Sequence, residues 1–193
     1  MNEDLDLRDD DLADERHERV RVADFARSLD LEIVYGGQDA ITFTTVNVNR
    51  LGMQMTGYFE LFAYERVQLM GEMEYSYLAR MTPEERMARF DPFFAYEIPC
   101  LIVTTGLEVF PEMLACAKKH KRPLFRSKHR TTFITSKVIN YLEEVLAPNT
   151  TMHGVLMDLY GVGVLITGNS GIGKSETALE LVQRGHALLR TTP

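Results

Sequence analysis

The sequence predicts an α/β fold built around a largely parallel sheet. Short β-branched, apolar runs alternate along the chain with segments whose apolar residues recur at helical spacing, which is the pattern of strands connected by helices. A glycine-rich loop near the C-terminal end of the chain, placed between one such run and one such segment, is typical of the same class. At 193 residues, with 45% hydrophobic and 25% charged residues, the chain can bury a core of ordinary globular composition.

The first helix is expected over residues 20–29, because Val22, Phe25, Ala26 and Leu29 share one face. Short β-branched or apolar runs then predict four strands, over residues 31–35, 41–45, 66–70 and 101–105. The run Thr82-Pro83-Glu84-Glu85 predicts a helix start, with Thr82 as the cap, Pro83 in the first turn and Glu85 completing a capping box.

Later elements continue the alternation. A helix is expected through Met113 and Ala117, a short strand over 123–125 and a long amphipathic helix over 131–146. The polar, proline-containing segment 147–151 is the best candidate linker. We therefore predict an acidic tail over 1–20, an N-terminal α/β domain over 21–147 and a second domain over 152–193.

Charge is spread unevenly along a chain whose net charge is −7. Residues 1–20 hold nine acids against three arginines, which predicts a solvated tail without a catalytic role. Residues 118–130 hold seven Lys or Arg and no acid. This basic segment is either a hydrated helix end and loop or a docking surface for an acidic partner or phosphorylated ligand. Nucleic acid is not an expected partner, because the chain is acidic and carries no recognised binding motif.

Three features of the sequence indicate the cellular compartment of the protein. Cys100 and Cys116 both lie in apolar segments and suggest no disulfide framework, which favours a reducing environment. The acidic N-terminal segment does not resemble a signal peptide, and no apolar run approaches the length of a membrane span. We expect a cytoplasmic protein without a membrane partner.

Residues 168–175, GNSGIGKS, match the phosphate-loop pattern G-x-x-x-x-G-K-[ST]. They follow an apolar run over 162–167 and precede a helical pattern over 176–184, which Gly185 would terminate. We predict that the backbone of the loop cradles nucleotide phosphates, that Lys174 reaches the outer phosphates and that Ser175 helps to hold magnesium. The alternative is a glycine-rich turn that matches by chance. The predicted nucleotide-binding residues are Gly168, Asn169, Ser170, Gly171, Ile172, Gly173, Lys174 and Ser175.

Strand patterns over 153–160 and 162–167 suggest a hairpin with Tyr160 and Gly161 as its turn. Antiparallel pairing then sets Leu159 opposite Val162 and, counting outward, His153 opposite Gly168. A histidine at the mouth of the loop could bind a phosphoryl oxygen or tune a proton transfer. The alternative is a histidine that merely ends a strand.

Residues 152–189, which include His153-Gly154-Val155-Leu156 and the phosphate loop, closely resemble the core of bacterial HPr kinase/phosphorylase. The similarity extends upstream to Thr56-Gly57-Tyr58-Phe59, to Glu65-Arg66-Val67-Gln68-Leu69 and to Pro83-Glu84-Glu85-Arg86. That family phosphorylates a serine of the phosphocarrier protein HPr, reverses the reaction with inorganic phosphate and thereby regulates carbon metabolism.

The resemblance implies a Mur-ligase-like N-terminal α/β domain followed by the start of a kinase domain like that of phosphoenolpyruvate carboxykinase. It implies a homo-hexamer that uses ATP and magnesium. It also implies that His153 and Lys174 are catalytic, that residues 168–175 bind ATP and that Ser175 is a magnesium ligand.

Two departures from the family pattern bear on activity. The acidic segment 1–20 has no counterpart in it, and the acidic pair that supplies the family's proton acceptor does not follow Leu189. We therefore expect a chain truncated at its C-terminal side and incomplete for catalysis. The alternative is a non-catalytic assembly or sensing module with a vestigial phosphate loop. Another phosphate-loop ATPase or GTPase would explain residues 168–175 but not the upstream matches.

Overall fold

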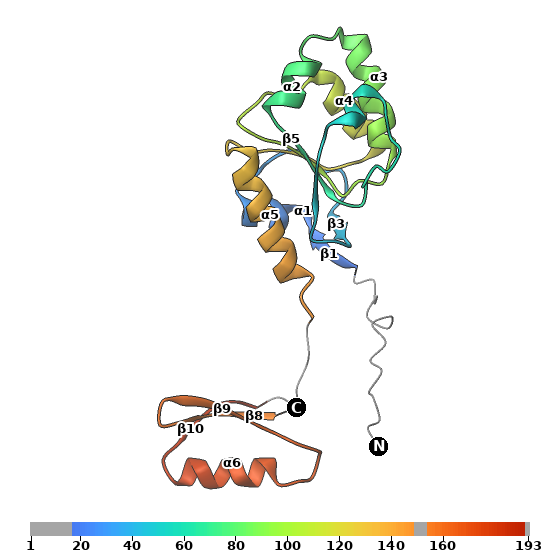
Figure 1. Ribbon diagram of the computed structural model, residues 1–193. Coiled ribbons are helices and arrows are strands. Elements are labelled where there is room, and N and C mark those ends of the chain that lie inside the picture. The colour runs from blue at the N-terminus through green and yellow to red at the C-terminus, as the bar shows by residue number, and fades with distance from the viewer. Residues whose placement is uncertain (1–16, 149–153, 192–193) are drawn as a thin grey trace, which may run out of the picture. The chain divides into compact units, whose positions relative to one another are not determined.

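A computed structural model describes residues 17–148 and 154–191 (Figure 1). The chain divides into two compact units, one ending at Ala147 and the other beginning at Pro148. We call them the first unit and the second unit, and each is described by itself. No helix in the described ranges is long and apolar enough to cross a membrane.

The first unit is organised by a five-stranded sheet in the order β2-β7-β6-β5-β4. Its strands are β2 (Glu32–Tyr35), β4 (Val48–Arg50), β5 (Val67–Met70), β6 (Leu101–Val103) and β7 (Leu124–Arg126). Strands β4 to β7 are mutually parallel, and β2 joins β7 in the antiparallel sense. The predicted mixed α/β fold with a largely parallel sheet is confirmed.

Helices cover both faces of this sheet. Helices α3 (Pro83–Ala95) and α4 (Pro111–His120) pack on one face, where α2 (Glu72–Leu78) adds Leu78. Helices α1 (Val22–Leu29) and α5 (Thr131–Val145) pack on the other face, as Figure 1 shows. Both faces of β5, β6 and β7 are therefore covered, which accounts for the mostly apolar sequences of these strands, interrupted by Gln68 and Arg126.

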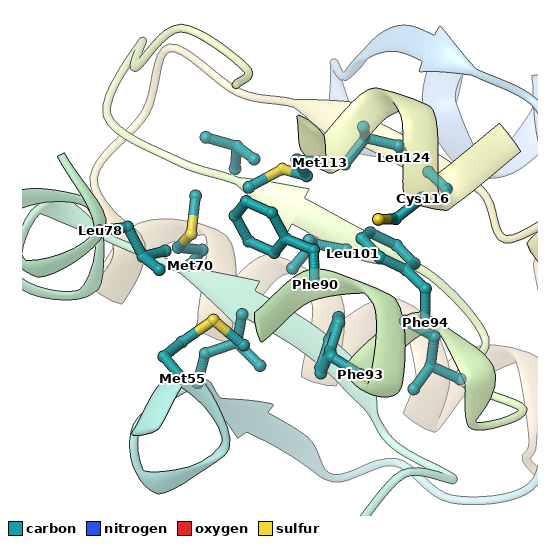
Figure 2. Packing of buried hydrophobic residues seen from close by; sticks show 14 of the residues in the cluster. Met55, Met70, Leu78, Phe90, Phe93, Phe94, Leu101, Met113, Cys116 and Leu124 are labelled. Atoms are coloured by element: carbon teal, nitrogen blue, oxygen red, sulfur yellow. The ribbon is translucent and has the colours of Figure 1, made fainter. Parts of the chain in front are cut away.

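The larger core cluster lies under α3 and is rich in aromatic and sulfur side chains. Phe90, Phe93 and Phe94 of α3 are fully buried and pack with Met70 and Leu101 of the sheet (Figure 2).

The start of α3 forms as predicted. The Thr82 hydroxyl accepts a hydrogen bond from the Glu85 amide at 3.2 Å, and the Glu85 carboxylate accepts one from the Thr82 amide at 2.8 Å.

Four elements of the first unit have no counterpart in the sequence-based prediction. They are β1 (Glu18–Arg21), β4, the 3₁₀ helix η2 (Met53–Thr56) and α2. The expected helix over 20–29 begins only at Val22, because Val20 pairs with Ile41 of β3 (Ala40–Phe43). Strand β1 therefore contains the last residues of the predicted 1–20 tail. Its charged residues hide the alternating pattern by which a strand is normally recognised.

The second unit is a three-stranded antiparallel sheet, in the order β10-β8-β9, with one helix. Its elements are β8 (Gly154–Leu159), β9 (Val162–Thr167), α6 (Lys174–Gln183) and β10 (Ala187–Thr191). Tyr160 and Gly161 connect β8 to β9 with φ angles of 55° and 82°, as a two-residue turn with two left-handed positions requires. The predicted hairpin is confirmed, with Leu159 opposite Val162 and Gly154 opposite Thr167.

Candidate phosphate-binding loop

Residues 168–173 form the loop that connects the end of β9 to the start of α6. Gly168 has φ 153° and Gly173 has φ 96°, values that side-chain-bearing residues rarely adopt. At Gly168 an added Cβ would also lie 3.1 Å from a methyl carbon of Ile172. The glycines that begin and end the pattern are thus required by the path of the backbone, as the phosphate-loop interpretation expects.

Lys174, the first residue of α6, folds back over this loop. Its ammonium group donates hydrogen bonds to the carbonyl oxygens of Gly168 at 2.8 Å and Asn169 at 2.9 Å. These two bonds hold the positive charge above the glycine-rich backbone. An ammonium group has three N–H donors, so one donor remains for a ligand oxygen.

The N-terminus of α6 points its unpaired amides into the same region. Gly173 is the N-cap and offers no side-chain acceptor, and the first bond of the helix runs from the Thr177 amide to the Gly173 carbonyl at 2.9 Å. The amides of the first turn therefore lack intrahelical partners and lie at the positive end of the helix dipole. The hydroxyl of Ser175, which is exposed, belongs to this first turn.

These features fit a phosphate group better than they fit a bare metal ion. Unpaired amides, the helix end and the remaining Lys174 donor all favour an anion. Within the described ranges, no group of three or more His, Cys, Asp or Glu side chains is arranged to hold a metal. The exposed Ser175 hydroxyl at this helix start is an oxygen that could serve as one ligand of a metal ion.

Thr177 was not singled out by the sequence analysis, although it shapes the loop. Its hydroxyl donates a 2.9 Å hydrogen bond to the Gly173 carbonyl, the same oxygen that accepts from its amide. The position four residues after the last loop glycine is the signal for this bond, because a threonine in a helix commonly bonds the carbonyl one turn earlier.

His153 lies outside the described residues, so its predicted position opposite Gly168 stays a prediction. The described part of the hairpin keeps the expected register as far as Gly154 and Thr167. The turn is reinforced by Asp158, whose carboxylate accepts a 2.7 Å hydrogen bond from the Gly161 amide.

The basic segment 118–130 does not form one continuous surface. Its middle is β7, whose Leu124 and Phe125 are fully buried in the sheet. Several of its cations are paired within the first unit: Lys119 with Asp91 at 2.7 Å, Arg122 with Glu97 at 3.6 Å and Arg126 with Glu32 at 3.7 Å. This pairing favours the hydrated helix end and loop over a single docking surface.

Neither cysteine is suited to thiolate chemistry. Cys100 is fully buried and Cys116 nearly so, and burial raises the pKa of the Cys116 thiol to about 11. Burial raises the pKa of the Cys100 thiol even further.

The fold and the loop define an α/β protein that carries a phosphate-loop sequence between a strand and a helix. A family model described as HPr Serine kinase N terminus matches residues 20–142, and one described as HPr Serine kinase C-terminal domain matches residues 144–190. The chain belongs to the HPr serine kinase family, as the resemblance in the sequence predicts.

Curated relatives agree with this assignment. The HPr kinase/phosphorylase of Alkaliphilus metalliredigens is 55% identical over 150 residues, which cover 78% of this chain and 48% of that protein. The HPr kinase/phosphorylase of Clostridium acetobutylicum is 47% identical over 171 residues, covering 89% and 56%. That of Caldanaerobacter subterraneus is 50% identical over 173 residues, covering 89% and 57%. The chain spans about half the length of these relatives.

Proposed function

We propose that this chain carries the nucleotide-binding loop of an HPr kinase/phosphorylase. Such an enzyme transfers a phosphoryl group from ATP to a serine of HPr and removes it again with inorganic phosphate. The proposal is supported by family membership, by the names of the relatives and by the loop itself. The observation that carries it is Lys174, held by two loop carbonyls above unpaired helix amides.

In this proposal each part of the loop has one task. ATP, when bound with magnesium, supplies the phosphoryl group to be transferred. The amides of residues 168–175 hold phosphate oxygens, Lys174 neutralises charge on the outer phosphates and Ser175 contributes its hydroxyl to magnesium. His153, which the sequence predicts opposite Gly168, would bind a phosphoryl oxygen or move a proton.

Further parts of the proposal come from the family. They are a homo-hexameric assembly, a cytoplasmic location, a role in regulating carbohydrate metabolism and HPr as the protein partner, without nucleic acid or membrane. The finer fold assignment, with a Mur-ligase-like first domain and a kinase domain like that of phosphoenolpyruvate carboxykinase, belongs to the same set.

Nucleotide binding is tested by isothermal titration of the full chain with ATP and magnesium. Replacing Lys174 with Ala removes the charge above the loop, and we expect binding to weaken by about tenfold or more, or about 1.4 kcal/mol. The matched control is Arg184→Ala, which removes a cation at the opposite end of α6, where Arg184 pairs with Glu180. Equal ATP affinity in Lys174→Ala and the unaltered chain would contradict the proposed role of the loop.

Phosphoryl transfer is tested with the same pair of proteins, HPr, ATP and magnesium. Serine phosphorylation of HPr above the level of the Lys174→Ala variant shows that the described loop serves catalysis in this chain. ATP binding without such transfer is the result expected of a chain that is incomplete for catalysis, and it is equally what an assembly or sensing module would give. The two outcomes separate ATP binding from phosphoryl transfer.

A further inference from the structure

A cavity of about 490 Å³ lies at the carboxyl edge of the parallel sheet in the first unit. Its lining comes from chain segments that directly follow strands. Arg50 is the last residue of β4, Glu72 begins α2 after β5, Thr105 follows β6, and Arg130 with Thr131 begins α5 after β7. The volume is within the range of small-molecule sites in proteins.

The course of the helices explains why this edge is open. Leu78 of α2 belongs to the core on one face of the sheet, and Ile134 of α5 belongs to the core on the other face. The chain therefore leaves the ends of β5 and β7 in opposite directions, and a crevice remains between the two helix starts. In open α/β sheets, a crevice outside the carboxyl ends of the strands is where ligands bind.

One cation of the cavity is held in place by a nearly buried acid. The guanidinium of Arg50 pairs with Glu74 at 3.2 Å, and the Glu74 side chain is only 9% exposed. The other carboxylate oxygen of Glu74 accepts a 2.9 Å hydrogen bond from the Gly71 amide at the start of α2. Arg50 is thus positioned by a carboxylate that is itself fixed, while its remaining N–H donors are available.

The second cation has no such partner. Among the described residues, Arg130 forms no ion pair and is exposed, and the first turn of α5 contains no acid and no side-chain cap. This turn is fastened to the sheet by the Thr131 hydroxyl, which lies 2.7 Å from the hydroxyl of the fully buried Thr104. Arg130 therefore brings to this side of the cavity a positive charge that no ion pair within the described residues neutralises.

Thr105, which also lines the cavity, has a strained backbone conformation. It has φ 63°, a left-handed conformation that is unfavourable for a β-branched residue. Such strain concentrates at functional sites, where the surrounding structure maintains it. The left-handed conformation of Thr105 ends the extended chain of β6 and leaves this threonine in the wall of the cavity.

We propose that this cavity binds the phosphate group of a small phosphate monoester, separately from the loop at residues 168–175. Arg130 and the start of α5 receive the phosphate, as a planar guanidinium and unpaired amides both suit its oxygens. Arg50 adds a second, positioned donor. Glu72, the acid that lines the cavity, accepts a hydrogen bond from a hydroxyl of the esterified alcohol.

The test is an amide-resolved NMR titration of the full chain with glycerol 3-phosphate and, separately, with inorganic phosphate. We expect saturable shifts at the amides of Thr131 and Thr132, and about tenfold weaker binding at these amides in Arg130→Ala. The matched control Lys118→Ala removes an exposed cation that does not line the cavity, and it should leave the affinity unchanged. Tighter binding of the ester than of inorganic phosphate, abolished in Glu72→Ala, identifies the alcohol contact.

Repeating the titration in Lys174→Ala separates the two sites. Shifts at Thr131 that persist in this variant support the cavity whatever the outcome at the phosphate loop. Absence of saturable shifts at Thr131 and Thr132, or equal affinity in Arg130→Ala and the unaltered chain, would overturn the proposal.

Discussion

Arg86 and Glu112 connect α3 to α4 through two short hydrogen bonds. The guanidinium donates to the two carboxylate oxygens of Glu112 at 3.0 and 2.9 Å, and also to the Met81 carbonyl at 2.7 Å. Both side chains are largely buried, at 14% and 11% exposure. The Arg86 guanidinium therefore holds the pKa of the Glu112 carboxyl below its ordinary value.

This lowered pKa predicts a dependence of stability on acid. The pair contributes its full stabilisation above the ordinary carboxyl pKa, and the contribution is lost as the pH falls through the lowered value. We expect Glu112→Gln to lower the thermal midpoint at neutral pH by roughly 5 °C, and the difference to shrink steadily in acid. Thermal unfolding followed by circular dichroism across this pH range measures it.

The control for this prediction is Glu143→Gln, which neutralises an exposed acid on α5 that has no ion pair within the described part of the chain. Its midpoint should stay close to that of the unaltered protein at every pH. A Glu112→Gln deficit that is constant down to strong acid would mean that the carboxylate charge is not what stabilises the pair.

At the scale of elements, the β8–β9 hairpin is a case in which local sequence patterns suffice to predict how two strands pair. Its register follows from two strand patterns and a two-residue turn, all of which are visible in the sequence. Helix α2 is different: its N-cap is Gly71, whose amide donates the hydrogen bond that completes the cap to the Glu74 carboxylate. The N-cap position of this helix holds no Ser, Thr, Asp or Asn, the residues by which a helix start is usually recognised. Helix α2 was therefore not predicted from the sequence.

The hairpin turn gives a second prediction. Gly161 has φ 82°, and Gly161→Val should destabilise the hairpin by about 1–2 kcal/mol because branched residues are strained there. The same substitution at Gly163, in the middle of β9, meets nothing within 4 Å and requires no left-handed backbone, so it should be neutral or stabilising. Hydrogen exchange of the β8 and β9 amides in the full chain compares them, and equal protection in both variants would contradict the turn assignment.

At the scale of the whole molecule, the two units differ in how much they bury. The first unit contains two core clusters, whereas the cluster of the described second unit has only Val155, Met157 and Ala178 as buried members. A sheet covered by so few buried side chains is marginal on its own. We therefore expect two thermal transitions in calorimetry of the full chain, with the lower one belonging to the second unit.

Substituting a core residue shows which unit unfolds in each thermal transition. Phe93→Ala removes a fully buried ring of the first unit and should lower its stability by about 3–5 kcal/mol. Only the upper transition should move. Phe133→Ala, at a ring that is 48% exposed on α5, is the matched control and should cost less than about 1 kcal/mol. A single transition that shifts in Phe93→Ala would show that the units unfold together.

The sequence predicted the class of fold and the strand and helix that flank the glycine-rich loop, because each depends on residues close together in the chain. It could not predict the cavity at the carboxyl edge. Arg50 and Arg130 are eighty positions apart, and they line one space only because β4 and β7 run in the same direction. The order of strands in a sheet is set by packing between distant segments, for which local spacing carries no signal.

The antiparallel pairing of β2 with β7 has a consequence for the order of folding. Strands β4 to β7 join their neighbours along the chain, but Glu32 pairs with Arg126 across a loop of about ninety residues. Closing so long a loop is slow, so we expect β2 to dock after the parallel strands have assembled. Until then β7 is an open edge that can pair with another chain. When β2 docks, it covers the open edge of β7 and becomes an edge strand of the sheet itself.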